Sequence, residues 1–315
     1  MILKHEARGF AEDKNRYPQF SFKKKVKRLG EKAFRVMPDK LFLSARYFLA
    51  FHRRMDWKDP QTLNEKLQWL KLHDRKDIYS SLVDKYEVRR HITDEIGEQY
   101  LIPLVGGPWD SFDQIDFSAL PDQFVLKCTH DSGGIVICTD KNTLDMNKTR
   151  RVIERCLKHN FFFGGREWPY KNVKPRIIAE KYMVDENGAK ELTDYKFFCF
   201  DGKVDCVMVC LDRSTGDTKF YFFDEAWRLK RLNIRGKNAP DGFAIPKPEC
   251  MDEMFRLAAK LSEGFPFLRV DLYQSGGKIY FGELTFFPDS GFDNNLLPET
   301  DRYFGQLIHM PQKKG

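Results

Sequence analysis

The stretch that most constrains the fold is FLRVDLYQSGGKIYFGELTFFP, residues 267–288. Two runs of alternating residues flank a Ser-Gly-Gly turn, a pattern that predicts two antiparallel strands joined in a hairpin. Because residues i and i+2 of a strand share a face, Arg269 lies on the same side as Asp271, and Glu283 on the same side as Thr285. We therefore expect the hairpin to bring Asp271 close to Glu283, with Arg269 beside them.

This arrangement suggests a metal site. Two carboxylates at hydrogen-bonding separation repel each other unless a cation or a proton lies between them. Hard oxygen ligands on a rigid sheet suit Mg²⁺, which prefers a few carboxylates together with phosphate oxygens. Asp271 and Glu283 are thus candidate Mg²⁺ ligands. The alternative is an ionic network of Arg269 with the two carboxylates on a solvated face.

A second unusual stretch is FVLKCTHDSGGIVI, residues 124–137, in which Lys127 interrupts an apolar strand just before a loop with two glycines. The backbone N–H groups of such a loop can contact phosphate oxygens, and a lysine at its root supplies a point charge. The order differs from a Walker A loop, because the lysine precedes Gly133 and Gly134. An edge lysine beside an ordinary hairpin is the alternative.

Between these two stretches lie RIIAEKYM, residues 176–183, and TDYKFFCF, residues 193–200. Residues that leave a strand for a linker can offer backbone groups to an adenine edge. Asp194 could accept hydrogen bonds from ribose hydroxyls, and Lys196, on the same face, could reach a phosphate or acyl-phosphate oxygen. A solvated strand face with ordinary charges is the alternative at each position.

The basic excess of the chain belongs to its N-terminal part. The net charge is +7, and residues 1–60 hold 16 Lys and Arg against 7 Asp and Glu. Basic clusters alternate there with aromatic residues and leucines, which predicts one or two amphipathic helices. These helices could pack on the body of the protein or contact an anionic membrane surface. Nucleic acid is a less suitable partner, because it would leave the hairpin carboxylates without a role.

The rest of the chain predicts helices first and mixed α+β structure afterwards. Thr62 and Glu65 have capping-box spacing at the start of one helix, and a second helix is expected over residues 81–97, ended by Gly97. Strands predominate from residue 100 onwards, with mostly antiparallel pairing.

Composition favours an intracellular protein. The start MILKHEARGF has no apolar signal region, and no stretch reaches the roughly 18 to 20 apolar residues of a membrane span. Seven cysteines at irregular spacing, without a CxxC pair, are expected to be reduced and mostly buried. We therefore expect a cytoplasmic protein, with possible peripheral membrane contact.

Taken in order, these motifs resemble the ATP-grasp superfamily. The segments TLNEKLQWLKL, DKYEVR, REWPYKNVKPRIIAEKYM and ELTDYKFFCFDGKV are similar to its TupA-like branch, named for teichuronopeptide biosynthesis. The resemblance implies an α+β fold in which two lobes with mostly antiparallel sheets clasp ATP. The expected division is a basic helical segment (1–60), a helical region (61–115), a small lobe with the glycine-rich loop (116–183) and a large lobe with the catalytic hairpin (184–315).

The resemblance also implies roles for individual residues. Those expected to hold ATP are Lys127, Ser132, Gly133 and Gly134 at the phosphates, Glu180, Lys181, Tyr182 and Met183 at adenine, and Asp194 at the ribose. Those expected to bind Mg²⁺ are Asp271, Glu283 and Thr285. Those expected to offset negative charge in catalysis are Lys196, Arg213 and Arg269. Many family members have Asn at the position of Thr285, a departure that bears on a second metal ion.

The implied reaction is ADP-forming ligation, in which a carboxylate becomes an acyl phosphate and an amine then displaces phosphate. The TupA-like branch implies an amino acid or amine joined to a sugar-acid carboxyl in cell-surface polysaccharide or capsule biosynthesis. Three alternatives remain. A kinase on the same scaffold would phosphorylate a sugar hydroxyl. A glycosyltransferase-like enzyme would need a nucleotide-sugar site, for which no convincing Asp-x-Asp is present. A basic binding module would leave the hairpin unexplained.

Overall fold

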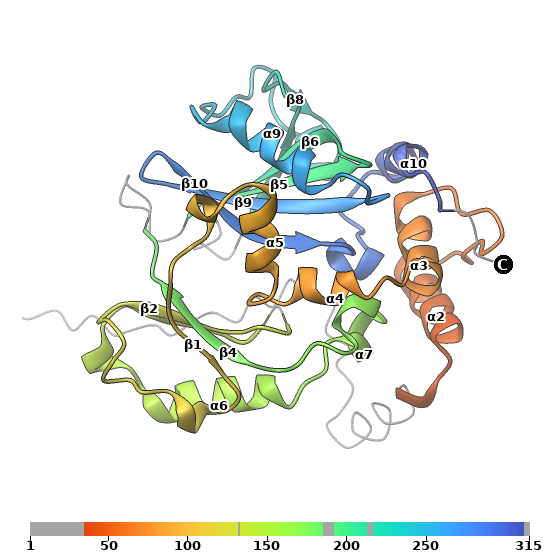
Figure 1. Cartoon of the computed structure of the whole chain (residues 1–315). Coiled ribbons are helices and arrows are strands. Elements are labelled where there is room, and N and C mark those ends of the chain that lie inside the picture. The colour runs from red at the N-terminus through yellow and green to blue at the C-terminus, as the bar shows by residue number, and fades with distance from the viewer. Residues whose placement is uncertain (1–34, 132, 185–191, 213–216, 312–315) are drawn as a thin grey trace, which may run out of the picture.

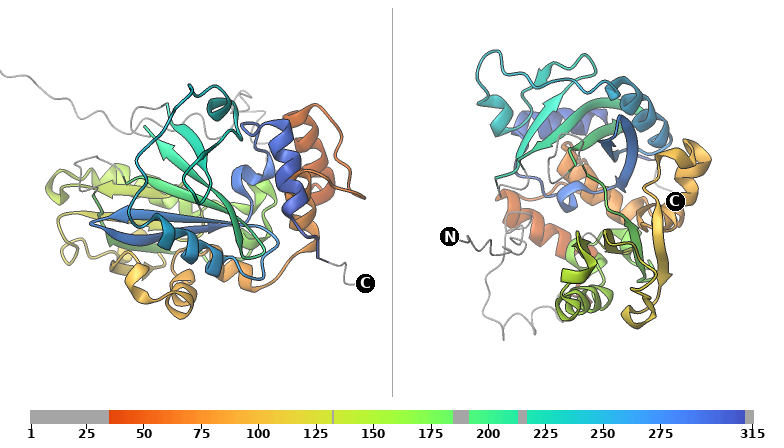
Figure 2. Two further views of the ribbon diagram at one scale, coloured as in Figure 1. Left: turned by 90° about the horizontal axis from the view of Figure 1, so that it is seen from above. Right: turned by 90° about the vertical axis from the view of Figure 1, so that its left-hand side faces the viewer.

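The fold is built on two antiparallel sheets that lie one above the other (Figures 1 and 2). The computed structural model describes residues 35–131, 133–184, 192–212 and 217–311. The four-stranded sheet, the small sheet, has the order β1-β4-β2-β3. Its strands are β1 (Leu104–Trp109), β2 (Phe124–Cys128), β3 (Ile135–Cys138) and β4 (Ile177–Lys181). Helix α6 (Met146–Leu157) covers its outer face and buries Ile153 against it (Figure 1).

The six-stranded sheet, the large sheet, has the order β10-β9-β5-β6-β7-β8. Its strands are β5 (Asp194–Phe200), β6 (Lys203–Leu211), β7 (Lys219–Phe223), β8 (Leu229–Lys230), β9 (Leu268–Ser275) and β10 (Lys278–Thr285). Helix α9 (Met251–Leu261) packs on its outer face, where Phe255 meets Phe197 edge to face at 5.1 Å between ring centroids. All seven residues of β5 are buried, so this strand is the centre of the sheet.

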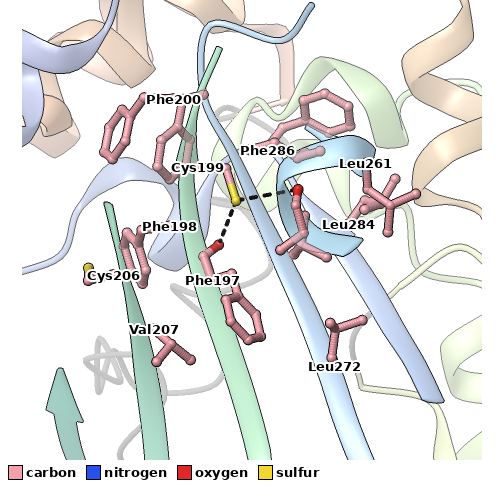
Figure 3. Packing of buried hydrophobic residues seen from close by; sticks show 14 of the residues in the cluster. Phe197, Phe198, Cys199, Phe200, Cys206, Val207, Leu261, Leu272, Leu284 and Phe286 are labelled. Atoms are coloured by element: carbon pink, nitrogen blue, oxygen red, sulfur yellow. Dashed lines mark hydrogen bonds between the residues drawn. The ribbon is translucent and has the colours of Figure 1, made fainter. Parts of the chain in front are cut away.

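The core of the large lobe combines aromatic, aliphatic and sulfur-containing side chains (Figure 3). Phe198 stacks on Phe304 at 5.5 Å. The Cys199 thiol donates weak hydrogen bonds to the Phe197 and Ala258 carbonyl oxygens, at 3.6 Å and 3.8 Å. Six of the seven cysteines are buried, which confirms the expectation that they are mostly buried.

The remaining elements connect and flank the sheets. The helices are α2 (Asp39–Phe51), α3 (Leu63–His73), α4 (Ile78–Val83), α5 (Val88–Glu95), α7 (Phe162–Gly165), α8 (Ile234–Lys237) and α10 (Pro298–Leu307). Short 3₁₀ turns are η1 (Glu98–Tyr100), η2 (Phe112–Gln114), η3 (Lys141–Thr143), η4 (Trp168–Tyr170) and η6 (Pro288–Gly291). Helices α2, α3 and α10 form a layer at one end of the molecule, whereas α4 and α5 lie beside the space between the sheets (Figure 1).

Most predicted elements are present, with two differences among the helices. The capping box of α3 is confirmed, because Thr62 Oγ1 accepts from the Glu65 N–H at 3.3 Å and Glu65 Oε2 accepts from the Thr62 N–H at 3.2 Å. The single helix expected over 81–97 is wrong, since the chain forms α4 and α5 instead. Asp84 Oδ1 accepts from the backbone N–H groups of residues 86 and 87 and turns the chain between them. Helix α10 was not predicted.

Two further expectations concern boundaries. Strand β1 pairs with β4, so the small sheet begins before the expected boundary at residue 116.

The predictions for the N-terminal segment fall largely on residues 1–34, which lie outside the described residues. Helix α2 buries Phe42, Leu43 and Tyr47, which confirms packing on the body for this part. Within the described ranges, no helix combines the length and hydrophobicity that crossing a membrane requires.

Candidate active site between the two sheets

A cavity of about 90 Å³ lies between the two sheets, and both contribute charged side chains to its wall. Lys127 and Glu180 come from the small sheet, and Glu283 comes from strand β10 of the large sheet. Arg89 enters from helix α5. The structure therefore brings together residues that are more than 150 positions apart in the sequence.

On the small sheet, the predicted phosphate lysine and the predicted adenine residue are bound to each other. Lys127 and Glu180 lie on adjacent antiparallel strands, where Val125 pairs with Glu180, so both charged side chains share one face. Lys127 Nζ is 2.5 Å from Glu180 Oε2, and Arg89 Nη1 is 3.7 Å from Glu180 Oε1. Burial lowers the pKa of Arg89, an effect that the charge of Glu180 partly offsets.

The glycine-rich loop is held from within. Asp131 Oδ1 accepts hydrogen bonds from the Gly133 and Gly134 N–H groups, at 3.1 Å and 3.0 Å. These two donors are therefore engaged by Asp131, whereas the resemblance implies that they contact phosphate. A Cβ atom on Gly134 would collide with the sulfurs of Cys128 and Cys156, so close packing requires this glycine. Ser132 lies outside the described residues.

The predicted adenine segment divides between two sites. Glu180 faces the cavity, but the side chains of Lys181 and Tyr182 line a separate open groove of about 660 Å³ beside Asp140. The Lys181 N–H donates to the Pro103 carbonyl at 2.9 Å and is not available to adenine. Among the four predicted adenine residues, Met183 included, only the side chain of Glu180 lines the cavity.

The hairpin places its charged residues as predicted. Asp271 is paired with Glu283, and Arg269 with Thr285. Arg269 Nε donates to Asp271 Oδ1 at 2.7 Å, and its Nη2 donates to Glu283 Oε1 at 3.1 Å and to Thr285 Oγ1 at 3.0 Å. The residues of the ionic alternative are thus in contact, but Arg269 and Asp271 are buried rather than on a solvated face.

A bulge at Gly282 sets this register. Phe281 pairs with Leu272, yet Glu283 pairs with Asp271, so Gly282 is the extra residue of β10. Without it, Glu283 would lie opposite a buried valine on the other face of the sheet. A Cβ at Gly282 would approach the Tyr273 ring to 2.8 Å and the Asp271 carbonyl oxygen to 2.9 Å, which restricts the position to glycine.

Lys196 is the centre of a buried ionic cluster on the same face. Strand pairing places it directly opposite Asp271, and its Nζ is 2.5 Å from both Asp271 Oδ2 and Asp194 Oδ2. Burial opposes the charged form of Lys196, but the two carboxylates outweigh this effect and raise its pKa. The two carboxylates thus favour the charged form of Lys196, and Asp194, predicted as a ribose ligand, is buried in contact with it.

Among the described residues, the hairpin cluster has one more carboxylate than cations. Lys196 and Arg269 are the two cations, and Asp194, Asp271 and Glu283 are the three carboxylates. Only the Glu283 side chain is appreciably exposed, at 38%. Hard oxygen donors with a residual negative charge suit Mg²⁺, so the donor chemistry of these residues fits the predicted metal.

Two further arginines, Arg213 and Arg89, bear on the predicted site. Arg213, predicted as catalytic, lies outside the described residues. Arg89 was missed, although it belongs to the DKYEVR segment, because an arginine on a short helix carries no sign that its guanidinium reaches a strand 90 residues away.

Comparison with known proteins shows the fold and the family of this chain. One family pattern, described as TupA-like ATPgrasp, matches residues 65–309. The two clasping α+β lobes are thus an ATP-grasp fold, as predicted. The chain belongs to the TupA-like ATP-grasp family.

Several solved structures are similar to this chain. D-alanine–D-alanine ligase from Bacillus anthracis matches at 17% identity over 78% of this chain and 67% of that chain, with a TM-score of 0.40. The corresponding ligase from Helicobacter pylori matches at 13% identity over 72% and 61%, with a TM-score of 0.39. ATP-grasp ligase PsnB, complexed with a precursor variant, Mg and ADP, matches at 12% identity over 70% and 57%, with a TM-score of 0.37. The comparison with curated proteins finds no match.

Proposed function

We propose that this protein is an ATP-dependent carboxylate–amine ligase that forms ADP. Its proposed substrates are a sugar-acid carboxyl of a cell-surface polysaccharide precursor and an amino acid or other amine. The observation that carries the proposal is the placement of Lys127 and Glu283 in the wall of one cavity, each backed by its own ionic cluster. A cationic wall suits phosphate, and an acidic wall suits the metal that accompanies it.

Each wall has a defined part in this proposal. Lys127 would bind phosphate oxygens of ATP, with Arg89 adding positive charge beside it. Oxygens of Asp271, Glu283 and Thr285 would hold Mg²⁺, which when bound offsets charge on the phosphates. Asp194 is proposed to hold Lys196 in place, in addition to the ribose contact that the resemblance implies.

The reaction requires positive charge rather than a nucleophilic side chain. A carboxylate oxygen of the acceptor attacks the γ-phosphorus, and the bond to ADP breaks. The amine then attacks the acyl carbon, loses a proton and displaces phosphate. In the first step, the anionic carboxylate approaches the negatively charged γ-phosphate, so fixed cations nearby lower the barrier of this step. Lys196 and Arg269 are buried, charged and held by carboxylates, which suits them to this role.

The test is an isotope-transfer experiment. ADP release is first screened across sugar acids combined with amino acids, and a productive acceptor is then labelled with oxygen-18 in its carboxylate. A ligase transfers one labelled oxygen to the released phosphate. Turnover that leaves all label in the acceptor would end the ligase proposal. Phosphate retained on the product would establish a kinase, and ATP-independent turnover of a nucleotide sugar would establish a glycosyltransferase.

A further inference from the structure

A second cluster of metal-ligating side chains lies beneath the glycine-rich loop, apart from the cavity lining described above. Cys128 is the last residue of β2, His130 and Asp131 begin the loop, and Cys156 lies in the last turn of α6. All four side chains are buried. The cluster therefore connects the loop to the helix that covers the small sheet.

The ligand atoms converge on one point. One atom each of His130, Asp131 and Cys156 lies within 4.8 Å of the others. Cys156 Sγ is 2.6 Å from Asp131 Oδ2. The Cys128 sulfur adjoins the same space, because a Cβ on Gly134 would collide with both sulfurs. Nitrogen, carboxylate oxygen and sulfur are the three donor types that Zn²⁺ accepts.

The imidazole of His130 has one nitrogen held by backbone carbonyl oxygens and one that can act as a metal ligand. Its Nε2 is 3.1 Å from the carbonyl oxygens of both Cys156 and His159. Carbonyl oxygens only accept, so Nε2 carries the proton and Nδ1 keeps a lone pair. Nδ1 is buried and has no hydrogen-bond partner among the described residues, while the whole side chain is only 3% exposed. A histidine held by a carbonyl through one nitrogen is typical of metal-bound imidazole.

We propose that His130, Asp131 and Cys156 bind a Zn²⁺ ion, with the sulfur of Cys128 adjoining the site. Binding displaces the Cys156 proton to solvent, because the thiolate is the form that coordinates. Asp131 would contribute Oδ2 to the metal while Oδ1 continues to hold the Gly133 and Gly134 N–H groups. The metal would thus fix the loop to α6 independently of any substrate.

Zinc affinity should rise with pH, because the Cys156 thiol must lose its proton to coordinate the metal, and one proton is released as this ligand binds.

The first experiment uses untagged wild-type protein and the metal alone. Metal-depleted protein is titrated with Co²⁺, and absorption from thiolate-to-cobalt charge transfer is followed. We expect one ion per chain and full loss of the band when Zn²⁺ is added. Absence of the band at excess Co²⁺ would overturn the proposal, and this result does not depend on any variant folding.

Variants then assign the ligands. Cys156→Ala and His130→Ala should each lower Co²⁺ affinity by at least tenfold or abolish the band. Cys138→Ala is the matched control, since Cys138 is a buried cysteine of the same sheet with its sulfur 3.7 Å from the Asp122 carbonyl oxygen. A band that persists unchanged in Cys156→Ala would overturn the assignment. X-ray absorption of the zinc-loaded wild type should show mixed sulfur and nitrogen or oxygen ligands, and a shell of oxygen alone would contradict the site.

Discussion

The two sheets face the same cavity with ionic clusters of opposite sign. Beside the small sheet, Lys127 of β2 and Arg89 of α5 contact Glu180, which gives one excess positive charge among the described residues. On the large sheet, the described residues of the hairpin cluster have one more carboxylate than cations. The cations around Glu180 are also more accessible, with 22% and 17% of the Lys127 and Arg89 side chains exposed.

The difference in burial indicates different uses. Lys127 is bound through its Nζ to one carboxylate and can exchange that contact for a phosphate oxygen. Asp271, by contrast, is bound by Arg269 through both of its oxygens and by Lys196 as well, so Mg²⁺ can bind this carboxylate only by displacing one of these contacts. We therefore expect substitutions on the small sheet to change ligand affinity, and those on the large sheet to change both catalysis and stability.

The largest effect is expected for Lys196→Met. Loss of a fixed cation next to the transferred group should lower kcat about 10²–10³-fold, while the KM for ATP changes much less. The variant also removes the cation that bridges two buried carboxylates, Asp194 and Asp271, which should cost about 3–5 kcal/mol of unfolding free energy. ADP release and urea unfolding measure the two effects.

A double variant separates the catalytic from the structural contribution. Asp194→Asn in the Lys196→Met background removes one of the two buried negative charges that Lys196 offsets, so part of the stability should return. Turnover should not return with it. If activity recovers together with stability, Lys196 serves only to hold the fold, and the proposed catalytic role fails.

Asp271→Asn and Glu283→Gln compare a buried carboxylate with a partly exposed one on the same hairpin. Both should raise the Mg²⁺ concentration needed for half-maximal turnover. Only Asp271→Asn should strongly lower the free energy of unfolding, by about 3–5 kcal/mol, because Arg269 and Lys196 lose their shared partner. Equal stability losses, or full Mg²⁺ response in Glu283→Gln, would contradict the assignment.

Lys127→Ala tests the small-sheet cluster against a neighbouring lysine. ATP with Mg²⁺ should raise the melting temperature of the wild type through preferential binding to the folded state. Lys127→Ala should lose most of this increase, whereas Lys181→Ala should keep it, because Lys181 lines the separate groove. Stability without ligand should change little, since Glu180 retains Arg89.

The sequence predicted best the features that depend on local alternation. The strand carrying Lys127, the central strand with Asp194 and Lys196, and the two strands of the final hairpin lie where the sequence predicts them. The helix of residues 63–73 was equally predictable, because its capping box depends only on residues that are close together in the sequence. The ATP-grasp fold followed from the order of these motifs.

Features that depend on tertiary pairing could not be read from the sequence. The alternation rule alone does not reveal the bulge at Gly282, although the face of Glu283 depends on it. The pairing of Lys127 with Glu180 requires β2 and β4 to be neighbours, 50 residues apart. Likewise, nothing local indicates that Asp131 would bind the glycine N–H groups of its own loop.

The smallest effect, and the sharpest contrast, is expected for the two loop glycines. In Gly134→Ala the new methyl group would meet the sulfurs of Cys128 and Cys156, and overpacking of this kind costs about 1–3 kcal/mol. In Gly133→Ala the nearest atom is Asp131 Oδ2 at 3.9 Å, an ordinary contact, so unfolding free energy should stay within about 0.5 kcal/mol of wild type. Urea unfolding measures both variants. The loop is a phosphate-contacting element only if Gly133→Ala, despite its unchanged stability, weakens ATP binding. The opposite result is that ATP affinity is unchanged in Gly133→Ala and falls in Gly134→Ala only as far as stability falls. The two glycines then serve to pack the base of the small sheet, and Lys127 remains the phosphate contact of this sheet.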